Sequence, residues 1–175
     1  NEWGDCTIER ILSLRPQRVL EIGCGVGLLL FRIAPHCTYY SGIDLSVEAI
    51  DNVKARLSKS KQDFSHVNVA AKPAHELEEF EAESFDTIVI NSVIQYFPNV
   101  DYLVQVLEKA VKLVKPGGQI FIGDVRSLPL LEALHTGIQL CQSPVSLACD
   151  RLKERIQQRM ARDKELVIHP DFFSA

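Results

Sequence analysis

Short apolar runs rich in β-branched residues alternate with amphipathic stretches over most of the chain. Each run has the length and continuity of a buried strand. The runs cover residues 19–22, 38–43, 66–70, 86–90 and 119–123. The stretches with helical spacing cover residues 7–14, 28–33, 46–59 and 101–114, and a short acidic helix is expected over 74–80. Because strands that alternate with helices form parallel sheets, the pattern predicts an α/β fold with a doubly wound, mostly parallel sheet.

The last third of the chain has a different pattern, dominated by helices. Two helices are predicted over 128–141 and 150–166, and a short strand is predicted at 166–168. The second helix has a narrow apolar stripe, and its remaining surface is mildly basic and expected to be solvated. We interpret residues 1–126 as an α/β core and residues 127–175 as a helical extension or lid of the same domain.

Composition narrows the functional classes. The length of 175 residues fits one domain, and the net charge of −4 argues against a nucleic-acid surface. The five cysteines form no C-x-x-C pair and the histidines show no metal-ligand spacing, so we expect free thiols, a cytoplasmic location and no metal. The apolar runs are too short to cross a bilayer. Because the chain begins with Asn1, we expect it to be part of something longer.

A glycine-rich turn follows the first predicted strand. Gly23, Gly25 and Gly27 leave almost no side chains between this strand and the next helix, so a ligand could approach the main-chain N–H groups. The dinucleotide fingerprint has the spacing G-x-G-x-x-G, but here Leu28 stands at the third position. Glu21 would repel a pyrophosphate and could accept from an ammonium group. The turn therefore favours a methyl donor with a cationic amino-acid end over a nicotinamide dinucleotide.

Polar residues also follow the other predicted strands. Asp44 lies about twenty residues after the glycine turn, where doubly wound folds place a carboxylate that accepts from ribose hydroxyls. Ser46 is the expected N-cap of the next helix. Asn91 and Ser92 end the fourth strand and Asp124 ends the fifth. Because the carboxyl ends of parallel strands meet at one edge of a sheet, these residues are expected to converge with the glycine turn on one ligand site.

Several phrases of the sequence resemble known families. E-x-G-x-G-x-G from Glu21 and K-P-G-G from Lys115 resemble the class I S-adenosylmethionine-dependent methyltransferases, which implies their Rossmann-like fold. NSVIQYFP, GDVRSLPLLEALH and ELVIHPDFF are similar to methyltransferase domains of nonribosomal peptide synthetases and hybrid polyketide synthases. This resemblance implies S-adenosylmethionine as cofactor, a phosphopantetheinyl carrier protein as partner, and a substrate held as a thioester. It also makes the basic predicted helix a possible carrier-docking surface.

The same resemblance implies roles for individual residues. The methyl donor would be bound by Glu21, Gly23, Cys24, Gly25, Gly27, Asp44, Leu45, Ala74, Asn91 and Ser92. The acceptor would be faced by Tyr96, Asp124 and His135, with His135 as the base supported by Asp124. The sequence departs from the family pattern at Pro73, where an acid is expected to contact the adenine. No antiparallel hairpin can be recognised after Phe173, so we expect a sheet without the C-terminal hairpin.

The choice of acceptor atom stays open at this point. N-methylation of a tethered amine is favoured, and O-methylation of a tethered hydroxyl or a free small molecule is the alternative. A scaffold domain without activity is a third possibility. A nicotinamide-dependent oxidoreductase is disfavoured, because the chain lacks both the third glycine and a catalytic Tyr-x-x-x-Lys.

Overall fold

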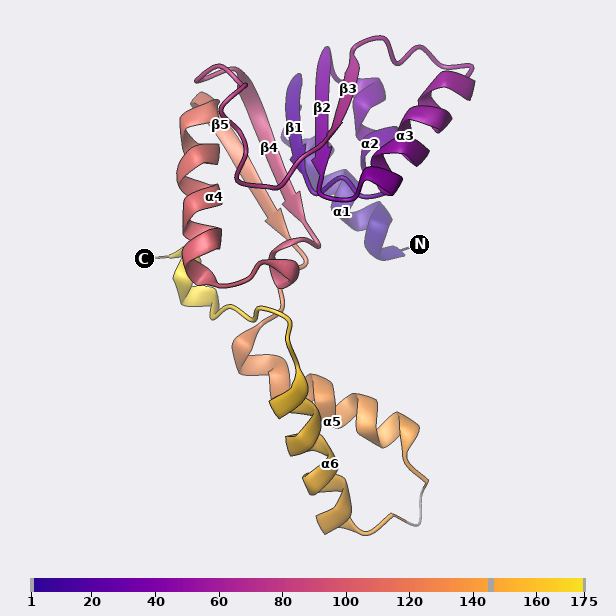
Figure 1. Ribbon diagram of the computed structural model, residues 1–175, viewed down its shortest axis with the longest axis vertical. Coiled ribbons are helices and arrows are strands. Elements are labelled where there is room, and N and C mark those ends of the chain that lie inside the picture. Colours follow the sequence, from indigo (N-terminus) through magenta and orange to yellow (C-terminus); the bar gives the residue numbers. More distant parts are fainter. Residues whose placement is uncertain (1, 145–146, 175) are drawn as a thin grey trace. The chain divides into compact units, whose positions relative to one another are not determined.

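The computed structural model describes residues 2–144 and 147–174 (Figure 1). The chain divides into two units. The first unit contains the residues up to Val93 together with Asn99–Asp124, and the second contains Ile94–Pro98 together with the residues from Val125 onward. The short segment Ile94–Pro98 therefore interrupts the first unit, a feature that the pattern of apolar residues does not indicate.

A five-stranded sheet with the order β3-β2-β1-β4-β5 forms the centre of the first unit (Figure 1). Its strands are β1 (Arg18–Ile22), β2 (Tyr39–Asp44), β3 (Val67–Ala71), β4 (Phe85–Asn91) and β5 (Val114–Gly123). All four pairings are parallel, which confirms the predicted doubly wound sheet. The strand order reverses between β1 and β4, and such reversals are where open α/β sheets bind ligands.

Helices cover both faces of this sheet, as the continuous apolar strands require. The helical elements of the first unit are α1 (Glu2–Ser13), α2 (Leu30–Ile33), η1 (Ala34–His36), α3 (Val47–Lys59) and α4 (Val100–Leu113). One face packs residues of α1, α2 and α3 against Val19, Tyr40 and Val89. On β4 the residues of the opposite alternation, Ile88 and Ile90, are also fully buried. The predicted N-cap is confirmed, since Ser46 Oγ accepts from the Ala49 N–H at 3.2 Å.

The second unit is helical. Its elements are η2 (Ile94–Tyr96), η3 (Leu128–Leu130), α5 (Leu131–Gln142), α6 (Cys149–Arg162) and η4 (Pro170–Phe173). Helices α5 and α6 pack on each other. The Leu166 N–H donates to the Gln95 carbonyl at 2.9 Å, which joins the segment Ile94–Pro98 to this unit. Within the two described ranges, no helix combines the length and apolar character that a membrane crossing needs.

Four predicted elements differ from the structure. Residues 74–80 form turns rather than a helix, because the His75 carbonyl accepts from Lys109 Nζ at 2.6 Å instead of from a helical N–H. Strand β5 begins at Val114, ahead of the K-P-G-G phrase, with a register shift against β4. Helix α6 ends at Arg162, four residues before Leu166, because Asp163 Oδ1 accepts from the Glu165 N–H and forms a turn. The predicted strand at 166–168 is a single bridge between Ser127 and Ile168.

Candidate active site

In the glycine turn after β1, side chains pack against the first and third glycines, whereas the space beside the second glycine is empty. All three glycines have positive φ, which favours glycine. At Gly23 an added Cβ would lie 2.2 Å from a methyl group of Val93, and at Gly27 it would lie 2.9 Å from the Phe31 ring. At Gly25 an added Cβ would have no heavy atom within 4 Å. The turn therefore presents bare backbone at Gly25, held in place by its two neighbours.

Asp44 connects this turn to the ends of β2 and β3. Its Oδ2 accepts from the Gly25 N–H and its Oδ1 from the Ser46 N–H, both at 2.8 Å. Its main-chain carbonyl accepts from the Lys72 N–H at 2.8 Å, which brings the segment with the half-buried Ala74 to the same edge. Leu45 is 75% exposed beside Asp44. A carboxylate, an apolar side chain and open backbone thus border one another.

Glu21 lies at the end of β1 but is only 3% exposed. The Tyr40 hydroxyl donates to its Oε2 at 2.7 Å. Burial, helped by the charge of Asp44 and opposed by the Tyr40 hydrogen bond, raises the pKa of Glu21 to about 7. The predicted contact with a ligand ammonium group stays a prediction. Burial also raises the pKa of the Cys24 thiol, so Cys24 is a neutral small residue in the turn rather than a nucleophile.

Strands β4 and β5 end in a second polar cluster. Ser92 and Asp124 both have left-handed backbone, with φ of 59° and 53°. The Ser92 hydroxyl donates to Asp124 Oδ2 at 2.6 Å and accepts from the Asn91 side-chain amide at 3.1 Å. Asn91 Oδ1 is buried and has no hydrogen-bond partner within residues 2–144 and 147–174. A strained backbone beside an unsatisfied buried oxygen is typical of a functional site.

A pocket of about 470 Å³ adjoins this cluster. It is lined by Asn91, Phe121, Gly123 and Asp124 from the strand ends and by Glu2, Cys6, Thr7 and Arg10 from α1. The sequence analysis did not assign α1 to the site. Thr7 is a buried polar residue of α1, but its burial is a property of the fold that the sequence pattern does not reveal.

Tyr96 and His135 belong to the second unit, with Tyr96 73% exposed in η2. His135 is 7% exposed, and its Nε2 lies 2.9 Å from Asp163 Oδ2. Arg126 also contacts Asp163 Oδ2 at 2.9 Å and reaches Glu165 at 2.6 Å. The carboxylate beside His135 is thus Asp163, whereas Asp124 accepts from Ser92. Sequence analysis missed Asp163 because it placed this residue inside the longer predicted helix.

Asp163 is the centre of an ion-paired network. Burial raises its pKa, but hydrogen bonds from the Glu165 N–H, from His135 and from Arg126 outweigh this effect, and the pKa falls below its usual value. Asp163 is therefore ionised at neutral pH. It can orient the His135 ring and fix which of its two nitrogens carries the proton.

The chain is similar to proteins of one known family. A family model described as "Methyltransferase domain" matches residues 20–120. The chain is 45% identical over 173 residues to chondramide synthase cmdD of Chondromyces crocatus, which covers 99% of the chain and 4% of that protein. It is 36% identical over 181 residues to the nonribosomal peptide synthetase TES of Alternaria alternata, which covers 100% of the chain and 3% of that protein. The chain thus spans a small part of these relatives.

Solved structures share the fold. The N-methyltransferase NodS of Bradyrhizobium japonicum, in complex with S-adenosyl-L-homocysteine, superposes with a TM-score of 0.64 at 23% identity. The match covers 90% of the chain and 72% of NodS. The class I methyltransferase fold inferred from the sequence is confirmed.

Proposed function

Because this chain belongs to the methyltransferase domain family and is homologous to segments of nonribosomal peptide synthetases, we propose that it N-methylates an aminoacyl or peptidyl intermediate tethered to a carrier protein. The observation that carries the proposal is the open glycine turn at Gly25, bonded to Asp44 and set at the strand reversal. A turn of this kind fits a small ligand that contacts backbone N–H groups.

The residues at this edge fit S-adenosylmethionine as the methyl donor. The Asp44 carboxylate would accept from the ribose hydroxyls, and the exposed Leu45 with the half-buried Ala74 would cover the adenine. The unsatisfied Asn91 Oδ1 offers an acceptor for the donor's ammonium group, alongside the charge of Glu21. When bound, the cofactor supplies a methyl group that is already activated by its sulfonium. The chain's own task is therefore mainly to position the two reactants.

The acceptor side needs a base. An amine attacks only when neutral, and its nitrogen must lose one proton as the new N–C bond forms and the C–S bond of the donor breaks. Asp163 favours the His135 tautomer in which Nε2 carries the proton, so Nδ1 is the nitrogen able to accept one. Tyr96 and Asp124 are the remaining polar groups that we assign to the acceptor, and Asp124 accepts from Ser92 on the donor side.

Two measurements on the purified chain test this proposal. Calorimetric titration should show binding of S-adenosylhomocysteine and none of NAD or NADP. Incubation with S-adenosylmethionine and aminoacyl or hydroxyacyl pantetheine thioesters, followed by mass spectrometry, should give a methylated amine. His135→Ala should lower turnover without changing the affinity for S-adenosylhomocysteine.

Each contrary outcome has a definite meaning. Methylation of only the hydroxyacyl thioester would replace N-methylation by O-methylation. Binding without turnover on either substrate would favour a scaffold domain. Absence of S-adenosylhomocysteine binding by a folded chain would overturn the proposal.

A further inference from the structure

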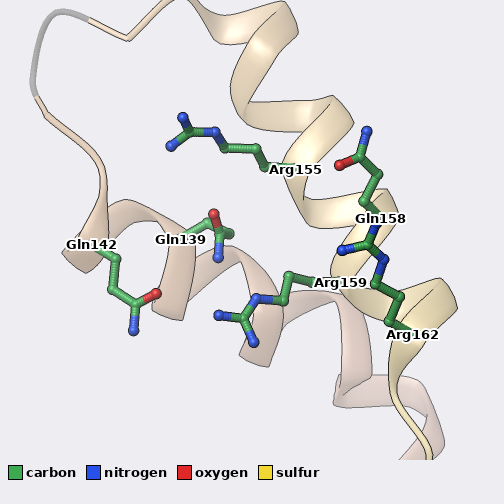
Figure 2. A pocket seen from close by; sticks show the side chains of 6 residues that line it. All are labelled: Gln139, Gln142, Arg155, Gln158, Arg159 and Arg162. Atoms are coloured by element: carbon green, nitrogen blue, oxygen red, sulfur yellow. The ribbon is translucent and has the colours of Figure 1, made fainter.

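A groove of about 280 Å³ lies between α5 and α6 in the second unit, apart from the residues assigned to methyl transfer (Figure 2). It is lined by Gln139, Gln142, Arg155, Gln158, Arg159 and Arg162. In Figure 2 the guanidinium groups of Arg155 and Arg159 extend from α6 toward α5. Every lining residue is polar, and every charge is positive. A volume near the lower end of the range for small-molecule sites, about 300–1,000 Å³, suits a compact anionic group.

The arginines of this groove have no acidic partner in the part of the chain that the structure describes. Arg155, Arg159 and Arg162 follow one another at helical spacing, so they share one face of α6. No acidic residue is among those that line the groove. Asp163 and Glu165 pair with Arg126, and Glu154 pairs with Arg151. The three guanidinium groups are thus available to an anion from outside.

Gln139 adds a neutral polar group to the groove. It is 6% exposed and lines the groove from α5. A side-chain amide has two N–H donors and one acceptor oxygen, so Gln139 adds a neutral donor to the three guanidinium groups. The amide can donate to a ligand oxygen in the same space that the arginines enter.

We propose that this groove binds the phosphate of a phosphopantetheine arm, the group that would tether the substrate. The proposal rests on the proposed function, which requires a carrier-bound thioester. Guanidinium groups match phosphate oxygens in a paired, bidentate geometry that a lysine does not reproduce. The chain as a whole has a net charge of −4, so attraction of a phosphate to this place comes from the local arrangement and not from the overall charge.

Calorimetric titration of the full chain with 4′-phosphopantetheine, and separately with pantetheine, tests the assignment. The phosphorylated compound should bind at least tenfold more tightly. The double variant Arg155→Gln/Arg159→Gln should lose at least tenfold in affinity, and Arg155→Lys/Arg159→Lys should recover part of it. The control Lys153→Gln/Lys164→Gln removes the same charge from the same unit but outside the groove, and should bind as the wild type does.

Three results would overturn the proposal. One is equal binding of pantetheine, another is equal binding of inorganic phosphate, and the third is an equal loss in the control. Titration of every variant with S-adenosylhomocysteine separates this proposal from the proposed function. If that ligand binds and phosphopantetheine does not, the groove assignment fails alone. If phosphopantetheine binds and S-adenosylhomocysteine does not, the methyltransferase proposal fails and the groove remains an isolated phosphate site.

Discussion

Each unit holds a carboxylate away from solvent, but the two carboxylates have different partners and opposite pKa shifts. In the first unit Glu21 is enclosed by the sheet and has a neutral partner, the Tyr40 hydroxyl. In the second unit Asp163 is less enclosed and lies between the cationic Arg126 and the imidazole of His135. The pKa of Glu21 rises to about 7 because burial dominates, whereas the pKa of Asp163 falls because its partners outweigh burial.

This difference shows what each carboxylate is suited to do. Burial disfavours the charge of Glu21, and an approaching cation would favour it. An ionised Asp163 already has its cation and serves to hold Arg126 and His135 in place. The first carboxylate is suited to respond to a ligand, and the second to maintain a fixed arrangement.

The largest expected effect comes from removing the ion-paired carboxylate. Asp163→Ala leaves the partly buried Arg126 and His135 without their common partner, and should lower the free energy of unfolding by about 4 kcal/mol. Urea unfolding followed by circular dichroism measures it. Because the pKa of Asp163 is lowered, its contribution is present at neutral pH and is lost as the pH falls below its ordinary value of 3.8. The deficit of the variant should shrink accordingly.

A control substitution at Glu165 tests whether the loss of stability is specific to Asp163. Glu165→Gln removes the more exposed partner of Arg126 and should cost less than about 1 kcal/mol. Equal losses in the two variants would contradict the central role of Asp163.

The carboxylate with the neutral partner should behave in the opposite sense. Glu21 has an ordinary pKa of 4.5 that rises to about 7 in the folded chain, so the folded state holds the proton that the unfolded state releases between these values. Stability due to Glu21 is therefore greatest below pH 4.5 and falls as the pH rises to 7. Glu21→Gln should gain about 3 kcal/mol relative to wild type across this window.

Unfolding measured at a series of pH values, with Glu48→Gln as a control on an exposed residue, checks the Glu21 effect. A stability difference that does not change with pH would show that the pKa of Glu21 is the same in the folded and the unfolded chain. The contrast between the two carboxylates would then disappear.

Substitutions in the glycine turn test whether the stability of the first unit depends on close packing, whereas that of the second depends on ion pairs. Gly23→Ala places a Cβ against Val93 at positive φ and should cost about 3 kcal/mol of stability. Gly25→Ala meets no atom and should cost about 1 kcal/mol, but should weaken S-adenosylhomocysteine binding at least tenfold. Thermal unfolding and calorimetry separate the two. Equal stability losses would mean that Gly25 is also closed by packing.

The smallest effect concerns Asp44, a carboxylate that accepts mainly from backbone N–H groups. If it holds the ribose, Asp44→Ala should weaken S-adenosylhomocysteine binding at least tenfold, about 1.4 kcal/mol. Ser46→Ala removes the neighbouring N-cap and should lower stability by about 1 kcal/mol with little change in affinity. Unchanged affinity in the Asp44 variant would remove Asp44 from the binding site.

Local signals explain how much of this structure the sequence could predict. The strands were recognisable because continuous β-branched runs such as 86–90 have few alternatives, and the glycine turn because Gly23 and Gly27 are required by packing. The failures depended on distant contacts. Lys109 bonds the His75 carbonyl and prevents a helix, and Asp163 ends α6 while pairing with residues far away in the chain. Local sequence propensity does not depend on such distant partners, so it cannot predict their effect.

The segment Ile94–Pro98 bears on how these units could be exchanged between related proteins. It lies in the sequence between two parts of the first unit, but it belongs to the second, where Gln95 is bonded to Leu166. Separating the units would break the chain after Val93, after Pro98 and after Asp124. A hybrid joined by one crossover at Asp124 would combine a native helical extension with a foreign five-residue insert. A hybrid that keeps the second unit intact must take both Ile94–Pro98 and the residues from Val125 onward from the same protein.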